Sequence, residues 1–136
     1  MTRFVSAVAI AAVAGLFVVS GVSTTPGALA AELTLQDNPI APSEESIAAG
    51  RGTYGRFCRS CHGIGADGRG MTAPPDSRPA NLVDEEWDHG NTDAAIFKVI
   101  REGVPPKYDM DAWEGRITDD DIWNVINFLR DLAASQ

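Results

Sequence analysis

The sequence predicts an all-α domain with three main helices joined by glycine- and proline-rich loops. Three stretches carry apolar residues at three- and four-residue steps, each behind a helix-capping residue. Between them lie runs of Gly and Pro, which interrupt helices. No stretch alternates apolar and polar residues over the length of a strand. We therefore expect helices and loops without a sheet.

The first helix is expected to begin after Ser43, an N-cap residue followed by two acids in the first turn, Glu44 and Glu45. Small and apolar residues then recur at helical steps, at Ile47, Gly50, Tyr54, Phe57 and Cys58. Seven glycines and prolines between residues 63 and 79 must form a loop. This helix therefore ends near the two cysteines of the chain.

The second helix is expected after Asn91-Thr92-Asp93, which form a cap and first turn, and it should stop at Gly103 before the Pro105-Pro106 pair. The third is the most regular. Its cap, Thr118, stands three residues before an acid, as in a capping box with Asp in place of Glu. An apolar stripe at helical period follows, at Ile122, Val125, Ile126, Leu129 and Leu132.

The amino terminus has the features of a secretory signal peptide. A cationic start at Arg3 precedes an apolar stretch from residue 4 to 19, and Ala28-Leu29-Ala30 places small residues before a cleavage point. The stretch is shorter than the roughly 20 residues of a membrane-spanning helix, which favours removal, although an uncleaved anchor stays open. We expect a signal peptide at 1–30, a flexible lead-in at 31–45, a domain at 46–133 and a tail at 134–136.

The mature chain is strongly acidic. Removing the leader takes away only Arg3 among the charged residues, which leaves 106 residues with ten basic and 19 acidic side chains and a net charge of −9. Nucleic acid and anionic lipid surfaces repel such a chain. We therefore expect neither as a partner, and no strong membrane association after leader cleavage.

The run Cys58-Arg59-Ser60-Cys61-His62 is the attachment signature of a c-type haem. Two residues between the thiols let both sulfurs reach the vinyl groups on one porphyrin edge, and the imidazole lies under the iron. A redox dithiol is expected in a βαβ unit, and a zinc site requires further ligands. The chain has only two cysteines, and His89 is its only other histidine. We expect one covalent haem c on Cys58 and Cys61, with His62 on iron.

This arrangement of helices around the motif resembles the monohaem class I cytochrome c family. The resemblance covers roughly residues 46 to 133 and implies a cytochrome c-like fold, three main helices wrapped around one covalently attached haem. In that family the first and last helices cross at a close contact. The matching residues are Gly50 and Tyr54 against Phe128 and Leu129.

The resemblance also implies the second iron ligand. Met71, Met110, His89 and Lys107 are the candidates, and the family carries its axial methionine between the second and last helices, which selects Met110. Met71 follows His62 too closely, and His89 is the main rival. The family's methionine is usually followed by proline, whereas here two carboxylates, those of Asp109 and Asp111, flank it.

An iron held by His and Met has no open position for a substrate, so we expect an exported electron carrier and not an enzyme. A haem enzyme or gas-binding protein with an open sixth site is the alternative. The segments at 82–90 and 101–105, with Trp113, look loosely like small cytochromes that serve quinoprotein alcohol dehydrogenases. This implies redox protein partners in the periplasm, with such a dehydrogenase as donor and a terminal oxidase as acceptor. Trp87, Trp113 and Trp123 are expected to lie in the core or against the haem.

Overall fold

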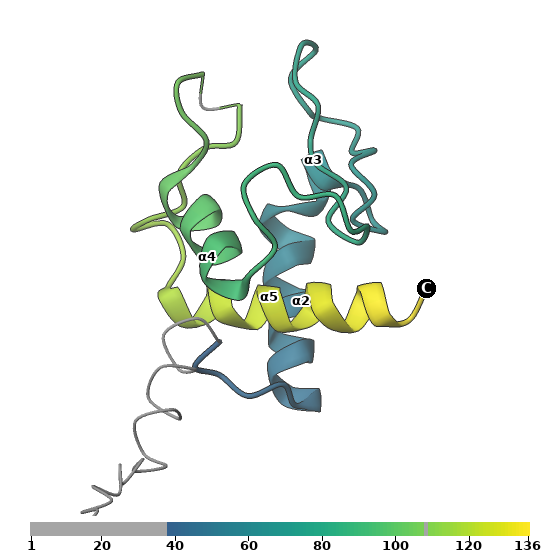
Figure 1. Ribbon diagram of the computed structural model, residues 1–136, viewed down its shortest axis with the longest axis vertical. Helices are drawn as coiled ribbons and strands as arrows, with labels where there is room; N and C mark the ends of the chain where they lie inside the picture. Colours follow the sequence, from purple (N-terminus) through teal and green to yellow (C-terminus); the bar gives the residue numbers. More distant parts are fainter. Residues whose placement is uncertain (1–37, 108) are drawn as a thin grey trace, which may run out of the picture.

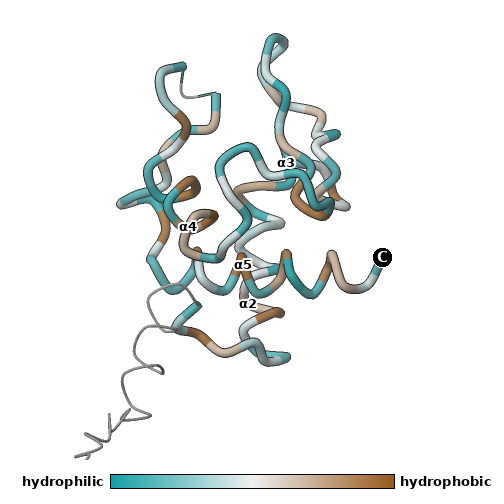
Figure 2. Tube along the Cα trace, in the orientation of Figure 1, coloured by the Kyte–Doolittle hydropathy of each residue, from teal (hydrophilic) through white to brown (hydrophobic). Residues whose placement is uncertain are grey.

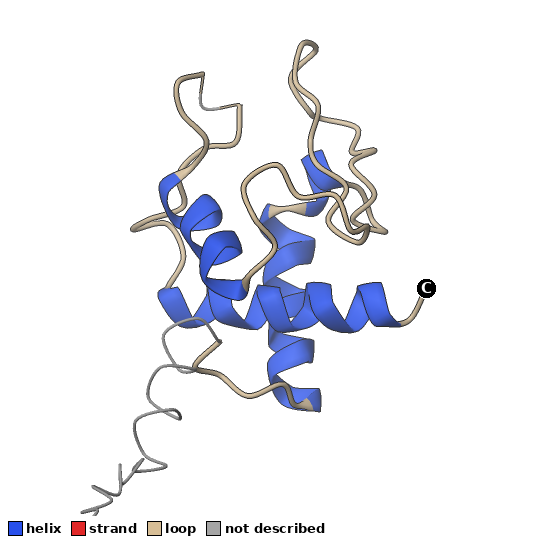
Figure 3. Ribbon diagram, viewed as in Figure 1, coloured by secondary structure: helices blue, strands red, loops and turns tan. Residues whose placement is uncertain are grey.

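The computed structural model describes residues 38–107 and 109–136. It contains helices α2 (Glu44–Phe57), α3 (Arg59–His62), α4 (Asp93–Glu102) and α5 (Asp119–Ala134). In this part of the chain the only β-type pairing is one isolated bridge, between Glu114 and Ile117. Figure 3 shows the rest as loops. The predicted all-α class and the three main helices are confirmed, while the predicted signal peptide and residues 31–37 of the lead-in lie outside the described residues.

Both long helices begin with reciprocal caps. In α2 the Ser46 amide donates to Ser43 Oγ (3.1 Å) and the Ser43 amide donates to Ser46 Oγ (3.0 Å). In α5 the Asp121 amide donates to Thr118 Oγ1 and the Thr118 amide donates to Asp121 Oδ2, each at 3.1 Å. Each pair satisfies two amides that a helix start leaves unbonded. The expected caps are confirmed, and Ser46 adds a capping partner that its residue type did not indicate.

α5 crosses α2 and forms with it the most extensive helix contact of the domain (Figure 1). The crossing depends on Gly50, because a β-carbon there would lie 1.9 Å from the carbonyl oxygen of Asn124 and 2.9 Å from the amide of Val125. The expected close contact is therefore present, but Gly50 faces Asn124 and Val125, one turn before the expected Phe128 and Leu129. Tyr54, one turn after Gly50, packs against Phe128 and Leu129 as expected.

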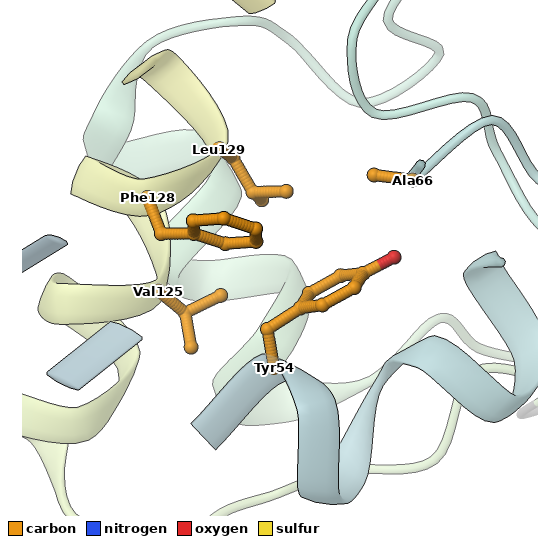
Figure 4. Packing of buried hydrophobic residues seen from close by; sticks show 5 residues of the cluster. All are labelled: Tyr54, Ala66, Val125, Phe128 and Leu129. Carbon is orange, nitrogen blue, oxygen red and sulfur yellow. The ribbon is translucent and has the colours of Figure 1, made fainter. Parts of the chain in front are cut away.

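The core forms two clusters. In the first, Tyr54 of α2 packs against Phe128 of α5 with ring centroids 5.3 Å apart, and Ala66, Val125 and Leu129 complete it (Figure 4). The second contains Ile96 of α4 with Ile122 and Ile126 of α5. Figure 2 shows apolar positions, in brown, on α4 and α5 and also in the loops around them. α5 thus supplies one wall to both clusters and holds α2 and α4 in one body.

A buried amide attaches the segment before α2 to α5. Asn127 donates from Nδ2 to the Ile40 carbonyl (2.9 Å) and to Ser46 Oγ (3.1 Å). Its Oδ1 accepts from Asn38 Nδ2 (2.9 Å). Buried amides of this kind stabilise only when their hydrogen bonds are satisfied, as they are here. None of the described helices has the length and apolar character needed to span a membrane.

Gly50→Ala is expected to destabilise the domain by at least about 1–3 kcal/mol, because the new methyl group meets backbone atoms that can move only if α5 shifts. Gly52, two residues further on, has no atom within 4 Å of the place that a methyl group would take, and it serves as the matched control. Gly52→Ala should stabilise by about 0.5–1 kcal/mol through the higher helix propensity of Ala. Denaturant unfolding of both variants measures the difference, and equal effects would contradict the close crossing.

Candidate haem site

Cys58 joins α2 to α3, and Cys61 and His62 lie in the single turn of α3. The Cys58 amide donates to the Tyr54 carbonyl (2.9 Å), so α2 runs directly into the motif. The amides of Cys61 and His62 both donate back to the Cys58 carbonyl, at 3.2 and 3.0 Å. Both thiols are free and half-buried. Burial, and then the charge of Cys61, raises the pKa of the Cys58 thiol to about 12. The backbone thus presents two thiols and an imidazole from a single helical turn.

His62 is oriented for metal binding through Nε2. Its ring is buried, and Nδ1 lies 3.1 Å from the Ala80 carbonyl oxygen. Because a carbonyl only accepts, Nδ1 must carry the proton and donate it, which leaves Nε2 with a free lone pair. Burial lowers the pKa of His62, although the Ala80 hydrogen bond opposes this in part. The neutral imidazole with a fixed tautomer is the form that binds iron.

The loop after α3 packs closely on the motif. The Gly70 amide donates to the Cys61 carbonyl and the Thr72 amide to the Ser60 carbonyl, both at 3.0 Å. A β-carbon at Gly70 would lie 2.2 Å from the Cys61 carbonyl group, so only glycine allows this approach. The same loop supplies the Ala80 carbonyl that orients His62. The same loop therefore contacts both the backbone of the motif and the imidazole ring of His62.

Tyr54 connects the helix crossing to the motif. Its hydroxyl donates to the Gly63 carbonyl at 2.7 Å, directly after His62, while its ring lies in the core. Figure 4 shows the hydroxyl directed toward the turn that carries Ala66. Burial is the main cause that raises the pKa of Tyr54 above its usual range, and the charges of Cys58 and Asp67 add to it. The neutral hydroxyl is thus favoured in the folded protein.

Met110 lies in the loop between α4 and α5. The Val104 amide donates to the Met110 carbonyl (3.0 Å), and the Trp113 amide donates to the Ile100 carbonyl (3.1 Å) at the end of α4. Gly103 adopts φ +74° and lies close under the loop, since its β-carbon would meet Met110 O at 2.7 Å. These hydrogen bonds hold the backbone of Met110 against the end of α4. In Figure 1 this loop and α3 rise from the same side of α5, the loop on the left and α3 on the right.

The other candidate ligands lie elsewhere. Met71 is 99 % exposed, and His89 and Lys107 are exposed as well. His89 lines a shallow hollow beside α4 with Lys98 and Val104. The structure therefore gives none of these three the buried surroundings that it gives His62.

The flanking aspartates are exposed, and one of them has a partner. Asp111 Oδ2 lies 3.5 Å from Arg116 Nη1, and the same guanidinium stacks on the ring of Trp113, 4.1 Å from its centroid. Arg116 was not singled out from the sequence, because its only signal there is a spacing of five residues from Asp111.

The three tryptophans are partly buried. Trp113 packs against Phe57, beside Cys58, with ring centroids 5.5 Å apart, and Trp123 stacks on Phe97 at 4.1 Å. Trp87 packs on the second core cluster and donates from Nε1 to the Asp84 carbonyl (3.0 Å). The expected core role fits Trp87 and Trp123, whereas Trp113 stands next to the haem motif.

These residues fit a covalent haem, because two free thiols and a free imidazole nitrogen lie on one turn under a loop that fixes them. Fold and motif together define a c-type haem protein. The family described as cytochrome c oxidase, cbb3-type, subunit III matches residues 45–129. The chain belongs to this cytochrome c family, whose members bind c-type haem covalently, and so has haem c as its cofactor.

Three relatives show the range of the family. The chain is 32 % identical over 100 residues to the cbb3-type cytochrome c oxidase subunit CcoP of Rubrivivax gelatinosus, covering 71 % of this chain and 29 % of CcoP. It is 30 % identical over 92 residues to subunit FixP of Bradyrhizobium diazoefficiens, covering 65 % and 28 %. It is 30 % identical over 91 residues to cytochrome c6 of Chlorolobion braunii, covering 67 % and 96 %. The chain thus spans under a third of the oxidase subunits and nearly all of cytochrome c6.

A solved structure supports the fold. The chain superposes on a chain of the Kuenenia stuttgartiensis reducing HAO-like protein complex Kustc0457/Kustc0458 with a TM-score of 0.60. The match covers 69 % of this chain and 46 % of that one, at 23 % sequence identity. It supports the cytochrome c-like fold that the sequence predicted.

Tyr54→Phe is expected to destabilise the domain by about 1 kcal/mol, because the buried Gly63 carbonyl loses its donor. The raised pKa of Tyr54 also makes folding stability fall as pH rises above the usual tyrosine value of about 10, since the unfolded chain ionises first. Unfolding measured between pH 7 and pH 11 should show this loss in the parent and less of it in the variant. Parallel pH curves would contradict the burial of the hydroxyl.

Proposed function

We propose that the chain is an electron carrier with one haem c, bound covalently by Cys58 and Cys61 and held on iron by His62 and Met110. The observation that carries the proposal is the hydrogen bond from His62 Nδ1 to the Ala80 carbonyl, which directs Nε2 away from the backbone. The position of Met110 supports the proposal, because hydrogen bonds hold its loop in place and the loop lies on the same side of α5 as α3. If His62 and Met110 both bind the iron, the metal keeps no open position for a substrate.

The residues around the site serve reversible electron transfer by staying in place. The bound haem supplies a one-electron change at its iron. Tyr54 and the loop at 63–72 hold the cysteine turn rigid through the hydrogen bonds to Gly63, Cys61 and Ser60. Trp113 and Phe57 form an aromatic contact beside the motif. A rigid setting keeps the reorganisation that accompanies each electron small.

The partners are redox proteins, as the family and its oxidase relatives support. We propose that the protein is exported after cleavage behind Ala30 and works in the periplasm, since cytochrome c domains of this kind are generally exported. A dehydrogenase, such as a quinoprotein enzyme, acts as donor and a terminal oxidase as acceptor. The names of CcoP and FixP as oxidase subunits favour the acceptor half of this proposal.

Met110→Ala is expected to remove the weak absorption band near ~695 nm that reports methionine on ferric haem, and to let the ferrous protein bind carbon monoxide. Met71→Ala is the matched control, since Met71 is fully exposed, and it should keep the parent spectrum. A parent protein that binds carbon monoxide freely would instead assign the open-site alternative, a haem enzyme or gas-binding protein. A Met110→Ala spectrum identical to that of the parent would reject Met110 as the ligand.

Asp109→Asn and Asp111→Asn are each expected to raise the midpoint potential by roughly 20 mV, because a nearby negative charge favours the ferric state and solvent weakens the effect. In Asp111→Asn, Arg116 also loses its counter-charge. Glu45→Gln is the control, since Glu45 is exposed on the first turn of α2, roughly 20 Å along the helix from Cys58. Potentiometric titration measures the midpoint potential of all three variants. A shift in Glu45→Gln as large as in the other two would contradict an effect of the charges next to Met110.

A further inference from the structure

The two iron ligands proposed above come from separate parts of the fold. His62 follows α2, whereas Met110 lies in the loop between α4 and α5. Hydrogen bonds hold the Met110 loop on the α4 side only, through Val104 and Trp113. Within residues 38–107 and 109–136, no hydrogen bond or ion pair joins residues 103–117 to residues 51–72. Direct contact between the two parts is therefore a matter of side-chain packing.

An aromatic pair makes this contact. The ring of Trp113 packs against that of Phe57, with centroids 5.5 Å apart and ring planes tilted by 59°. Phe57 is the last residue of α2 and directly precedes Cys58, and Trp113 stands three residues after Met110. Tilted rings at such a distance attract each other beyond the effect of the area they bury. The pair thus connects the cysteine turn to the loop of the axial methionine.

A guanidinium group lies over each ring of the pair. The Cζ atom of Arg116 is 4.1 Å from the centroid of Trp113, and that of Arg56 is 5.6 Å from the centroid of Phe57. Cations in this position are attracted by the negative face of an aromatic ring. Arg116 Nη1 also lies 3.5 Å from Asp111 Oδ2 in the same loop. Arg116 therefore connects the ring of Trp113 to the residue that follows the methionine.

The backbone of Trp113 is anchored as well. Its amide donates to the carbonyls of Ile100 (3.1 Å) and Arg101 (3.2 Å) at the end of α4. Its carbonyl accepts from the amides of Arg116 (3.0 Å) and Ile117 (3.3 Å). Because α4 itself packs on α5 in the second core cluster, this backbone has a fixed position in the domain. The ring of Trp113 is thus a fixed contact between the end of α4 and the cysteine turn.

We propose that Trp113 is a positioning residue for the axial methionine, because its ring, packed against Phe57 and Arg116, holds the Met110 loop at the cysteine turn. The inference rests on the ligation by Met110 proposed above. A neutral thioether competes for iron with external ligands such as imidazole. It stays bound as long as the loop keeps the sulfur near the metal, since a ligand held in place has a high effective concentration. Loss of the aromatic contact should therefore favour the external ligand.

Imidazole binding to the ferric holoprotein tests this role. The titration follows the loss of the weak band near ~695 nm that reports methionine on iron. Trp113→Leu keeps an apolar side chain but removes the ring, and we expect it to bind imidazole on the order of fivefold more tightly than the parent. Trp113→Phe keeps a ring and should stay close to the parent. Unchanged affinity in Trp113→Leu overturns the proposal.

Trp123→Leu is the matched control for a loss of stability. Trp123 stacks on Phe97 with centroids 4.1 Å apart, so this variant removes an aromatic pair of the same kind between α4 and α5. Denaturant unfolding should show a lower free energy of unfolding for Trp123→Leu, while its imidazole affinity stays near the parent value. An equal gain of affinity in Trp123→Leu and Trp113→Leu would assign the effect to general destabilisation and overturn the positioning role.

Phe57→Leu breaks the same contact from the side of α2. It should raise the imidazole affinity about as much as Trp113→Leu does. The double variant Phe57→Leu/Trp113→Leu should then gain little more than either single variant, because both changes remove one shared contact. Gains that multiply fully in the double variant would show that the two rings act independently, which overturns the pair as the element that holds the loop.

The parent protein separates a failure of this inference from a failure of the proposed ligation. A parent without the band near ~695 nm refutes ligation by Met110 and, with it, the role of Trp113. A parent with the band and a Trp113→Leu variant of unchanged imidazole affinity leaves the ligation intact and overturns the positioning role alone.

Discussion

The close crossing of α2 and α5 at Gly50 is the constraint on which the other features of the domain depend. Only a residue without a side chain lets the backbone of α2 approach the Asn124 carbonyl of α5. The approach places Tyr54, one turn further along α2, against Phe128. The hydroxyl of Tyr54 then reaches the carbonyl directly after His62. A contact between two helices thus determines the position of the haem motif.

The loop after α3 also holds the motif in place, and its close backbone contacts explain why the loop is rich in glycine. The Gly70 backbone lies against Cys61 with no room for a methyl group, and the Gly68 backbone lies against Pro79 in the same way. These approaches bring the Ala80 carbonyl to His62 Nδ1. The helices therefore position the turn that carries the ligands, whereas the loop selects the tautomer and direction of the imidazole. Neither part alone would prepare Nε2 for a metal.

Much of the fold was predictable from the sequence because its signals are local. Capping residues at Ser43, Thr92 and Thr118 and apolar residues at helical spacing define all three main helices. The five-residue motif likewise carries its chemistry in its own spacing. What could not be predicted depends on contacts between distant segments. The partner of His62 is a backbone carbonyl, which any residue at position 80 would supply, so nothing in the identity of Ala80 indicates its role.

The same distinction applies to charge. A count over the sequence gives a strongly negative protein and suggests repulsion of every anionic partner. The count weighs all carboxylates alike, but the structure pairs Asp93 with Arg130, Asp111 with Arg116 and Glu114 with Arg101, all of them outside residues 51–80. Coulomb interactions across water fade within about 8–10 Å, so a partner at the cysteine turn responds mainly to the side chains around it. Those side chains include Arg59 and Arg69 as well as Asp67, so the charge around the turn differs from the strongly negative charge of the whole chain.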